Sequence, residues 1–375
     1  MKIAFLGSSE FSKVVLQKLV ANGKHKVVCV VCNLDKSSGR GQKIQFSPVK
    51  VFAIQNNIPV LQYARVSREG YDDIKAFNPD VLVTASFSHI LKQNILDLAP
   101  YGVLNVHPSL LPKYRGSCPV NWTLIKGEKI TGVTIMKTDI GLDSGDIILQ
   151  KEYPVSPTDT TGELSLKLAD FGADLLIEAL DKIETNTASY TKQDESKMSY
   201  YPMLDKNMGK IDFSNTAEEI VNLVRGLNPW PLCFVEYKNR NSEIKKIKVF
   251  SASIVLCKKD ILSRYLRANN CYSENDSEDH MEEMFQKISN GTVVCATSKT
   301  GLIAKAQDNF VLLDIIQAEN GKKMSSRDFL NGTKISVNTI LNEAEVDDDN
   351  IEDWFVKFEF WRIKRDFEWY RSTKI

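Results

Sequence analysis

The sequence predicts an α/β protein in which a Rossmann-like, mostly parallel sheet is followed by a small, OB-like β-barrel. Its 375 residues exceed the length at which one core is usual, so two domains are expected. Short apolar runs alternate with helical stretches in the first half, a pattern typical of βαβ units. Beyond residue 230 the runs are short and strand-like, which favours a small all-β domain.

The first domain is predicted over residues 1–188. Its strands are short apolar runs, and its helices carry apolar residues at helical spacing. Strands are expected at residues 3–6, 27–31, 81–85, 103–106, 131–136 and 147–153, and helices at 11–20, 48–55 and 164–183. Pro48 stands at the first position of its helix, where its missing N–H is tolerated.

The second domain is predicted over residues 207–335. A polar, poorly periodic stretch precedes it, and we place a linker there at residues 189–206. The polar and acidic stretch 269–279 is expected to be a mobile loop. Within the domain we expect a helix at 217–227 and strands at 233–237, 246–255, 292–296 and 310–316.

The tail over residues 336–375 is predicted to be helical, because Trp354, Phe358 and Trp361 follow an acidic run at helical spacing. Apolar stripes are mostly buried in a core, which favours a helix packed on the body of the protein. The alternative is an aromatic and basic surface that stacks on RNA.

The charge balance neither requires nor excludes a nucleic-acid partner. The chain carries 48 basic and 48 acidic side chains, and its pI is about 6.9. Contact with nucleic acid would therefore have to come from a local basic patch.

The seven cysteines indicate a reducing environment. Cys29 and Cys32 form a C-x-x-C spacing, but they lie in an apolar run without a second ligand pair, so we predict buried structural thiols. No apolar stretch reaches membrane-spanning length, and the chain opens directly on a strand-like run. We therefore expect no signal peptide, transit peptide or membrane anchor, and a cytoplasmic location.

The first strand-to-helix turn argues against two phosphate-binding motifs. Residues 7–12 contain one glycine where a dinucleotide fingerprint needs three, and Glu10 would repel a pyrophosphate. No Walker-type loop occurs either. An NAD-type enzyme is therefore disfavoured.

The densest cluster of chemically useful residues follows the run 103–106. Asn105 and His107 would lie at the carboxyl end of a parallel strand, the edge at which open α/β sheets bind ligands. Because they are two positions apart, both side chains can point to one side. Taken alone, His107 is as readily a structural histidine as a catalytic one.

Two further loops carry candidate residues. Asp143 lies in a glycine-flanked turn after the strand 131–136, where its carboxylate could hold an imidazole or simply cap the turn. The stretch 35–43 is expected to be a long flexible loop with Lys36, Arg40 and Lys43. Such loops often contact phosphates, and a solvated surface loop is the alternative.

Together, Asn105, His107 and Asp143 resemble the catalytic core of enzymes that use 10-formyltetrahydrofolate. Further motifs along residues 1–335 are similar to those of the methionyl-tRNA formyltransferase family, and they lie at 39–43, 47–50, 109–112, 132–136, 210–214, 228–231 and 321–324. The segment 85–91 departs from the family's Ala-Tyr-Gly-like pattern, Lys113 replaces a usual arginine, and the tail has no counterpart.

The resemblance implies a formyltransferase domain and transfer of a formyl group from 10-formyltetrahydrofolate, as co-substrate, to methionine on initiator tRNA for translation initiation. Asn105 would donate to the oxyanion, His107 would share that role or move the proton, and Asp143 would orient the imidazole. No metal or covalent nucleophile is expected, because no Cys or Ser has an evident activating partner.

The resemblance also implies where the substrates bind. The folate site would be lined by Ser109, Leu110, Leu111, Pro112, Phe87, His89 and Ile90. The tRNA would be held by Arg40 and Lys43 at its acceptor end and by Lys206 and Lys210 of the barrel, with Lys245, Lys246 and Lys248 as further candidates. The expected partners are initiator Met-tRNA and reduced folate, with no DNA and no membrane, and a monomer suffices.

Two other functions remain open at this point. The first is a folate-dependent formyltransferase acting on a small amine, such as a purine precursor or a nucleotide sugar. The loop with Arg40 and the second domain argue against it, because a small substrate needs neither. The second is a non-catalytic RNA-binding factor, which the intact Asn105, His107 and Asp143 disfavour.

Overall fold

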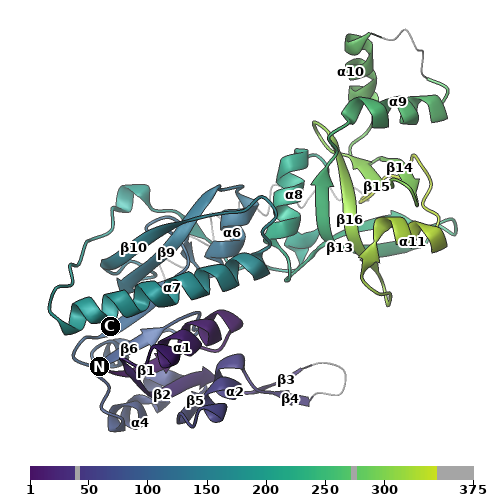
Figure 1. The fold of residues 1–375 in the computed structure, drawn as a ribbon. Helices are drawn as coiled ribbons and strands as arrows, with labels where there is room; N and C mark the ends of the chain where they lie inside the picture. The colour runs from purple at the N-terminus through teal and green to yellow at the C-terminus, as the bar shows by residue number, and fades with distance from the viewer. Residues whose placement is uncertain (39–42, 272–276, 344–375) are drawn as a thin grey trace, which may run out of the picture.

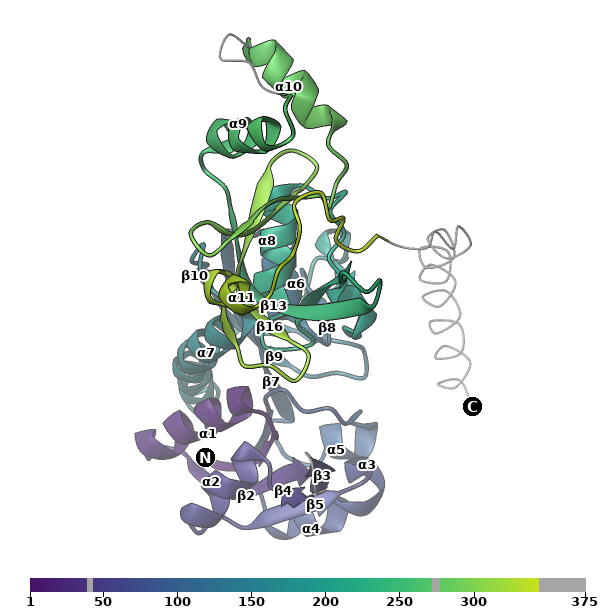
Figure 2. The same cartoon turned by 90° about the vertical axis from the view of Figure 1, so that its right-hand side faces the viewer.

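The computed structural model describes residues 1–38, 43–271 and 277–343. Two domains follow one another in an elongated molecule, and the long helix α7 (Thr161–Glu184) runs along the first (Figures 1 and 2). None of the helices in these residues combines the length and apolar character needed to span a bilayer.

The first domain is built on a seven-stranded sheet with the order β10-β9-β7-β6-β1-β2-β5. The strands β5, β2, β1, β6 and β7 pair in parallel, and β9 and β10 pair antiparallel. The predicted mostly parallel sheet is confirmed. Its strands are β1 (Lys2–Leu6), β2 (Lys26–Asn33), β5 (Val60–Tyr63), β6 (Val81–Thr84), β7 (Val103–His107), β9 (Ile130–Lys137) and β10 (Ile147–Pro154).

Helices cover both faces of this sheet. One face packs against α1 (Glu10–Asn22), α2 (Pro48–Gln55), α6 (Pro119–Ile125) and α7. The other packs against α3 (Val66–Glu69), α4 (Tyr71–Ala76) and α5 (Gln93–Leu96). Because both faces are covered, β6 is buried along its whole length, which explains its unbroken apolar run up to Thr84.

The second domain combines α8 (Ala217–Gly226) with a curled antiparallel sheet of order β12-β13-β16-β15-β14. Apolar side chains of α8, α11 and this sheet form one core. The predicted small barrel-like second domain is confirmed. Its other elements are β12 (Cys233–Lys238), β13 (Ile244–Ile254), β14 (Val293–Thr297), β15 (Gly301–Lys305), β16 (Phe310–Ala318), β17 (Met324–Ser325), which pairs with β16, and α11 (Ser326–Gly332).

A helical hairpin between β13 and β14 was not predicted. The helices α9 (Lys258–Ala268) and α10 (Glu278–Lys287) project from the end of the second domain (Figures 1 and 2). Phe285 is fully buried in a small separate core with Leu266 and Phe310, which fixes the hairpin to the sheet. Of the predicted mobile loop 269–279, residues 272–276 lie outside the described part of the chain.

The stretch 35–43, predicted to be flexible, is more regular than expected. β3 (Lys36–Ser38) and β4 (Lys43–Gln45) form an antiparallel two-stranded ribbon. Residues 36–38 and 43 were predicted to be loop, and for them that prediction was wrong, because they pair as strands. Residues 39–42, including Arg40, lie outside the described residues.

The segment predicted as a linker lies against the first domain. Thr191 pairs with Ile147, and β11 (Tyr200–Tyr201) pairs in parallel with β8 (Arg115–Gly116). The short 3-10 helix Glu195–Lys197 lies in this segment, and a second one, Asn207–Gly209, follows it and packs against the start of β12 in the second domain.

The described chain continues past the predicted end of the second domain. Leu341 is buried in the second core, and the Asn342 backbone amide donates to the Glu236 carbonyl at 2.8 Å. The rest of the predicted helical tail, residues 344–375 with Trp354, Phe358 and Trp361, lies outside the described residues.

The two domains meet where α8 packs on α6. The carbonyl of Gly226 accepts hydrogen bonds from Asn121 Nδ2 and from Thr161 Oγ1 of the first domain, both at 2.7 Å. A Cβ on Gly226 would lie 2.6 Å from the Ile125 side chain, so only glycine allows this close approach.

Candidate active site at the end of β7

Asn105 lies near the carboxyl end of β7, between Thr84 of β6 and Met136 of β9. The Thr84 hydroxyl donates to Asn105 Oδ1 at 3.1 Å and is also 3.2 Å from the Leu104 carbonyl. Because Oδ1 accepts from Thr84, the Asn105 amide nitrogen faces away, and it has no partner among the described residues. The half-buried side chain therefore presents a free donor.

His107, two positions further along β7, is buried at 4% exposure. Its Nε2 lies 3.1 Å from the carbonyl oxygen of Tyr114. A carbonyl only accepts, so Nε2 carries a proton and donates it. The other ring nitrogen, Nδ1, lies 3.9 Å from Asp143 Oδ1. Nδ1 is therefore the nitrogen that can take up or release a proton.

Asp143 reaches His107 from the loop after β9. Its backbone φ of 52° lies in the left-handed region, which residues other than glycine rarely adopt. Its Oδ2 accepts a hydrogen bond from the Gly116 amide at 2.9 Å. The loop depends on Gly145, because a Cβ there would lie 1.7 Å from the Lys137 carbonyl oxygen. The predicted trio thus meets at one edge of the sheet.

In the segment expected to line the folate site, residues 109–112, Ser109 and Leu111 make hydrogen bonds that fix the conformation of the loop. The Ser109 hydroxyl is fully buried and donates to the Lys113 carbonyl at 2.8 Å. Leu111 is also buried, and Gln150 Nε2 donates to its carbonyl at 2.9 Å. Leu110 and Pro112 are half-buried and remain available to a ligand.

The other expected folate residues follow β6. Phe87 and His89 are half-buried with ring centroids 4.7 Å apart, and Ile90 is 89% exposed. Burial lowers the pKa of His89, against a weaker opposing effect of Glu69. His89 Nδ1 is buried without a hydrogen-bond partner in the described residues, an arrangement suited to a polar ligand.

Metal-ligand spacing occurs elsewhere in the described residues. His25, Asp181 and Glu184 bring ligand atoms within 4.8 Å of one another near the end of α7. His25 Nε2 is hydrogen-bonded to Asp181 at 3.0 Å, and Lys24 lies 2.6 Å from the same carboxylate. The side chains of this group are hydrogen-bonded and ion-paired to one another or to Lys24. They are not next to Asn105, His107 or Asp143 in the sequence or in the sheet.

The predicted C-x-x-C thiols are buried in β2, as expected. Burial raises the pKa of Cys29 to about 12 and that of Cys32 to about 11, which disfavours the thiolate that a metal or a redox reaction needs.

The predicted tRNA-binding cations differ in their environments. Lys43 belongs to β4. Lys206 is exposed and has no ion-pair partner among the described residues, whereas Lys210 lies 3.5 Å from Glu236. Lys246 lies 3.2 Å from the same carboxylate, and Lys245 pairs with Glu243 at 2.9 Å.

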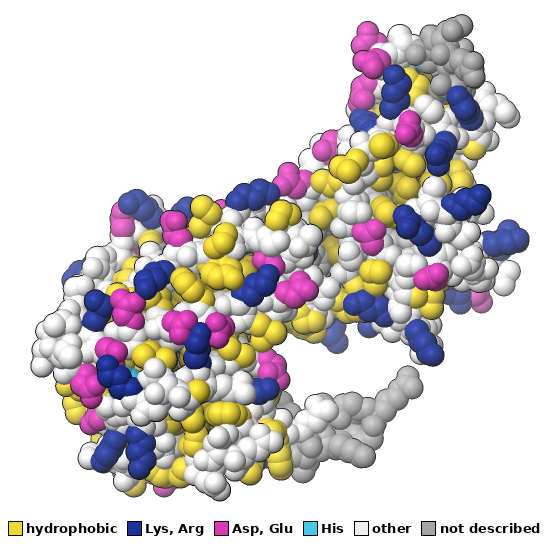
Figure 3. All heavy atoms as spheres, in the orientation of Figure 1, with side chains coloured by type: hydrophobic (Ala, Val, Ile, Leu, Met, Phe, Trp, Pro, Cys, Tyr) yellow, Lys and Arg dark blue, Asp and Glu magenta, His cyan; other side chains and the backbone are white. Residues whose placement is uncertain are grey.

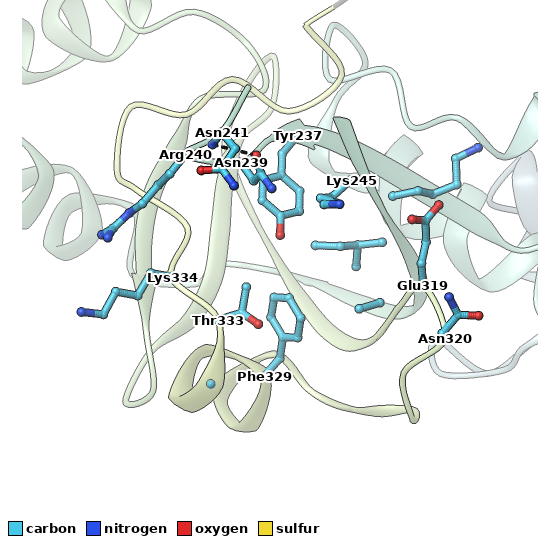
Figure 4. A pocket seen from close by; sticks show the side chains of 14 residues that line it. Tyr237, Asn239, Arg240, Asn241, Lys245, Glu319, Asn320, Phe329, Thr333 and Lys334 are labelled. Carbon is cyan, nitrogen blue, oxygen red and sulfur yellow. Dashed lines mark hydrogen bonds between the residues drawn. The ribbon is translucent and has the colours of Figure 1, made fainter. Parts of the chain in front are cut away.

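A hollow of about 710 Å³ opens on the second domain between the β12–β13 turn, the β16–β17 turn and α11. The Tyr237 hydroxyl points into it with Phe329 opposite, and Arg240 and Lys334 extend from its rim (Figure 4). Basic side chains gather on this side of the domain around α11 (Figure 3). Arg240 and Lys334 have no ion-pair partner in the described residues. Sequence reasoning missed both, because only the fold brings them together.

Two family models match the chain. Residues 1–180 match the one described as formyl transferase, and residues 203–334 match the formyl transferase C-terminal domain. Residues 181–202 fall between the two matches.

Curated relatives cover most of the chain. The methionyl-tRNA formyltransferase of Acetivibrio thermocellus is 39% identical over 344 residues, which are 92% of this chain and 100% of that protein. That of Clostridioides difficile is 38% identical over 342 residues, 91% of this chain and 100% of that protein.

Solved structures share the fold. A sugar 3N-formyl transferase, WlaRD, crystallised in the presence of dTDP and 5-N-formyl-THF, gives a TM-score of 0.55 at 21% identity, covering 86% of this chain and 98% of that one. HypX from Aquifex aeolicus gives 0.55 at 16% identity, covering 90% of this chain and 50% of that one. At these identities the likeness shows the fold alone.

Proposed function

Because the chain belongs to the methionyl-tRNA formyltransferase family, we infer that it transfers a formyl group from 10-formyltetrahydrofolate to the amino group of methionine on initiator tRNA. The observation that carries the inference is the 39% identity to such an enzyme across its whole length, together with the trio at the end of β7. The reaction serves the initiation of translation.

The chain's own residues supply a donor and a proton acceptor. Formyl transfer is an acyl transfer: the amine attacks the formyl carbon and negative charge develops on the formyl oxygen. When that charge returns to form the carbonyl, the bond from the formyl carbon to the folate nitrogen breaks, and the folate nitrogen leaves with a proton. The free Nδ2 of Asn105 donates to that oxygen, because Thr84 holds the amide in this orientation. His107 Nδ1 accepts the proton released by the amine, and the Asp143 carboxylate 3.9 Å away stabilises the imidazolium that results.

The reduced folate brings the formyl group, and we propose that it binds beside β6 and β7. The buried, unpartnered Nδ1 of His89 fits a ligand with a hydrogen-bond donor, and the exposed Ile90 fits an apolar ring. Leu110 and Pro112 complete the site from the loop after β7. In this proposal the buried Ser109 and Leu111 act chiefly by supporting the loop.

We propose that tRNA crosses both domains. Arg40 and Lys43 would meet its acceptor end, and Lys206 would hold a phosphate between the domains. The hollow with Arg240 and Lys334 adds a basic rim on the second domain, supported by the absence of ion-pair partners for these two cations in the described residues. Lys210 contributes less, because Glu236 already neutralises it.

The two other functions fit less well. A small-amine formyltransferase shares the fold, but the relatives at 34–39% identity over about nine tenths of the chain carry the methionyl-tRNA name. An RNA-binding factor without activity would have no need of the free amide of Asn105 or of the pairing between His107 and Asp143. As part of the same proposal we place a monomer in the cytoplasm, supported by seven free cysteines.

The test is formylation of purified Met-tRNA, initiator and elongator side by side, with 10-formyltetrahydrofolate. We expect formylation of the initiator by the wild type and a loss of at least about 100-fold with His107→Ala. A rise in the melting temperature of the variant on addition of folate shows that the variant is folded and still binds folate. No formylation of either tRNA by a wild type that binds folate would overturn the proposal in favour of a small amine.

A further inference from the structure

Gln193, from the segment between the two family matches, contacts the loop that carries Asp143. Its side-chain amide nitrogen donates to the Asp143 carbonyl and to the Gly145 carbonyl, both at 2.8 Å. The residue is 9% exposed. Both amide hydrogens of one buried side chain are thus used on the backbone of a single loop.

Arg115 fixes which way this amide points. Its Nε and Nη2 lie 3.1 and 2.7 Å from Gln193 Oε1. A guanidinium only donates, so the atom that faces it must be the oxygen, and the nitrogen must face the loop. Arg115 is itself held by Glu195, with Nη1 and Nη2 at 3.0 and 2.7 Å from the two carboxylate oxygens.

The same short strand, β8, therefore holds Asp143 twice. Gly116 binds its carboxylate directly through the backbone amide, and Arg115 binds its backbone through Gln193. Asp143 sits at a φ of 52°, in the left-handed region that aspartate adopts more readily than most side chains but that still costs free energy, and the external hydrogen bonds help to hold the loop in this shape. The position of the carboxylate opposite His107 follows from these contacts.

We infer that Gln193 is a positioning residue for formyl transfer, acting through Asp143 by holding the 143–145 backbone. The inference rests on the proposed role of Asp143. Gln193 touches neither substrate nor His107, so its substitution is expected to change turnover and to leave substrate binding unchanged.

Gln193→Glu is the sharpest variant. It keeps the shape of the side chain and strengthens the contact with Arg115, but it replaces the double donor by an acceptor facing two carbonyls. We expect kcat to fall by about 10- to 100-fold, with KM for tRNA and for folate within about twofold of the wild type. Gln193→Met, which removes the donors without adding charge, should give the same pattern if Gln193→Glu does not fold.

Asp194→Asn is the matched control. It exchanges an acid and an amide of the same shape at the neighbouring position, and the Asp194 side chain contacts Ser196 and Lys197 but neither Arg115 nor the Asp143 loop. Its kcat should stay within about threefold of the wild type. Melting temperatures of all variants separate unfolding from a change in turnover.

A double-mutant cycle with Asp143→Asn decides the mechanism. If Gln193 acts through Asp143, Gln193→Glu should reduce kcat by less than about threefold in the Asp143→Asn background. An equal loss in both backgrounds would overturn the inference, as would unchanged kcat in Gln193→Glu itself. Full activity of Asp143→Asn would instead overturn the proposed role of Asp143, a different outcome from the first two.

Discussion

At the scale of single residues, the active site depends on the orientation of one amide. Asn105 can donate only if its nitrogen faces the substrate, and the Thr84 hydroxyl on the neighbouring strand holds the oxygen back. A flipped amide would turn an acceptor toward a developing negative charge. One hydroxyl therefore protects the donor that the reaction needs.

Removing the donor should cost far more than removing the residue that orients it. We expect Asn105→Ala to lower kcat by about 100- to 1000-fold. Thr84→Val should lower it by about 2- to 10-fold, the value of one hydrogen bond. Thr123→Val is the matched control, because the Thr123 hydroxyl is buried without a partner in the described residues, and its loss should not reduce kcat. Equal effects of both threonine variants would contradict the orienting role.

His25 should make stability depend on pH. It is 2% exposed, and burial lowers its pKa, although a hydrogen bond to Asp181 acts in the opposite direction. The unfolded chain then binds a proton more readily than the folded one, near the ordinary histidine pKa of about 6.5. The free energy of unfolding should thus be constant above about pH 7 and fall as pH is lowered through about 6.5.

Urea unfolding at pH 7.5 and pH 5 measures this effect. His25→Gln cannot take up the proton, so its deficit in unfolding free energy relative to the wild type should shrink at pH 5. A deficit that is the same at both pH values would assign the pH dependence to other groups. His89, whose pKa burial also lowers, is the first alternative.

The candidate catalytic residues could be predicted from the sequence, but the residues that position them could not. Asn105, His107 and Asp143 lie at the end of predicted strands or in the loop after one, and the resemblance to a known family gave them their roles. Thr84 and Gln193 are ordinary polar residues whose value comes from contacts with residues 21 and 50 positions away. The hydrogen-bond partner of His107 Nε2 is a backbone carbonyl, and such a partner cannot be predicted from residue types.

At the scale of elements, the loop after β9 is the most constrained part of the site. It must turn tightly enough for Asp143 to reach back to β7, and Gly145 passes directly over the Lys137 carbonyl. No side chain fits at that point. The loop shape is therefore a condition for the catalytic contact.

The two glycines of this loop, Gly141 and Gly145, should differ in how well they tolerate an added methyl group. Gly145→Ala places a Cβ 1.7 Å from a backbone oxygen, so the loop must shift, and we expect a loss of stability of about 1–3 kcal/mol together with most of the activity. Gly141→Ala is the control, because the atom it approaches is the Ser144 hydroxyl, which can rotate away. Thermal unfolding and formylation rates measure both, and similar losses in the two variants would contradict this account.

Elements with strong periodicity were predictable, and those that depend on packing partners were not. Each predicted strand of the first sheet overlaps an observed one. For the parallel strands β1, β2, β6 and β7 the reason is that buried parallel strands read as unbroken apolar runs, whereas the half-buried parallel strand β5 was missed. The short α9 and α10 are mostly polar and become helices by burying residues such as Leu266 and Phe285 against the sheet. The ribbon β3–β4 depends on backbone pairing, which carries no clear sequence pattern.

At the scale of the whole molecule, the core of the second domain continues into the first, because Tyr114 and Trp122 of the first domain are buried in it. Gly226 lets α8 approach α6 closely, and two side chains of the first domain bind its carbonyl. The orientation of the second domain is thereby tied to the domain that carries the β7 cluster. If tRNA binds as we propose, the part held on the second domain lies at a fixed distance from Asn105, His107 and Asp143.

The free cations of the hollow should contribute to tRNA affinity through phosphate contacts. We expect Arg240→Ala and Lys334→Ala each to weaken tRNA binding and to reduce the slope of log affinity against log salt by about 1. Lys182→Ala, which removes the same charge near the far end of α7, should leave the slope unchanged. Titrations at several salt concentrations measure it, and identical slopes for all four proteins would place the phosphates elsewhere.

The path of the chain between the domains has a consequence for dividing the protein. Judged by sequence pattern, a catalytic fragment would end at residue 188, and the first family match ends at residue 180. Such a fragment would contain Asn105, His107 and Asp143 but lack Gln193 and the strand that pairs with β8. A fragment truncated there would contain all three proposed catalytic residues but would lack the contacts that position Asp143. A catalytic fragment that keeps these contacts must extend beyond Tyr201.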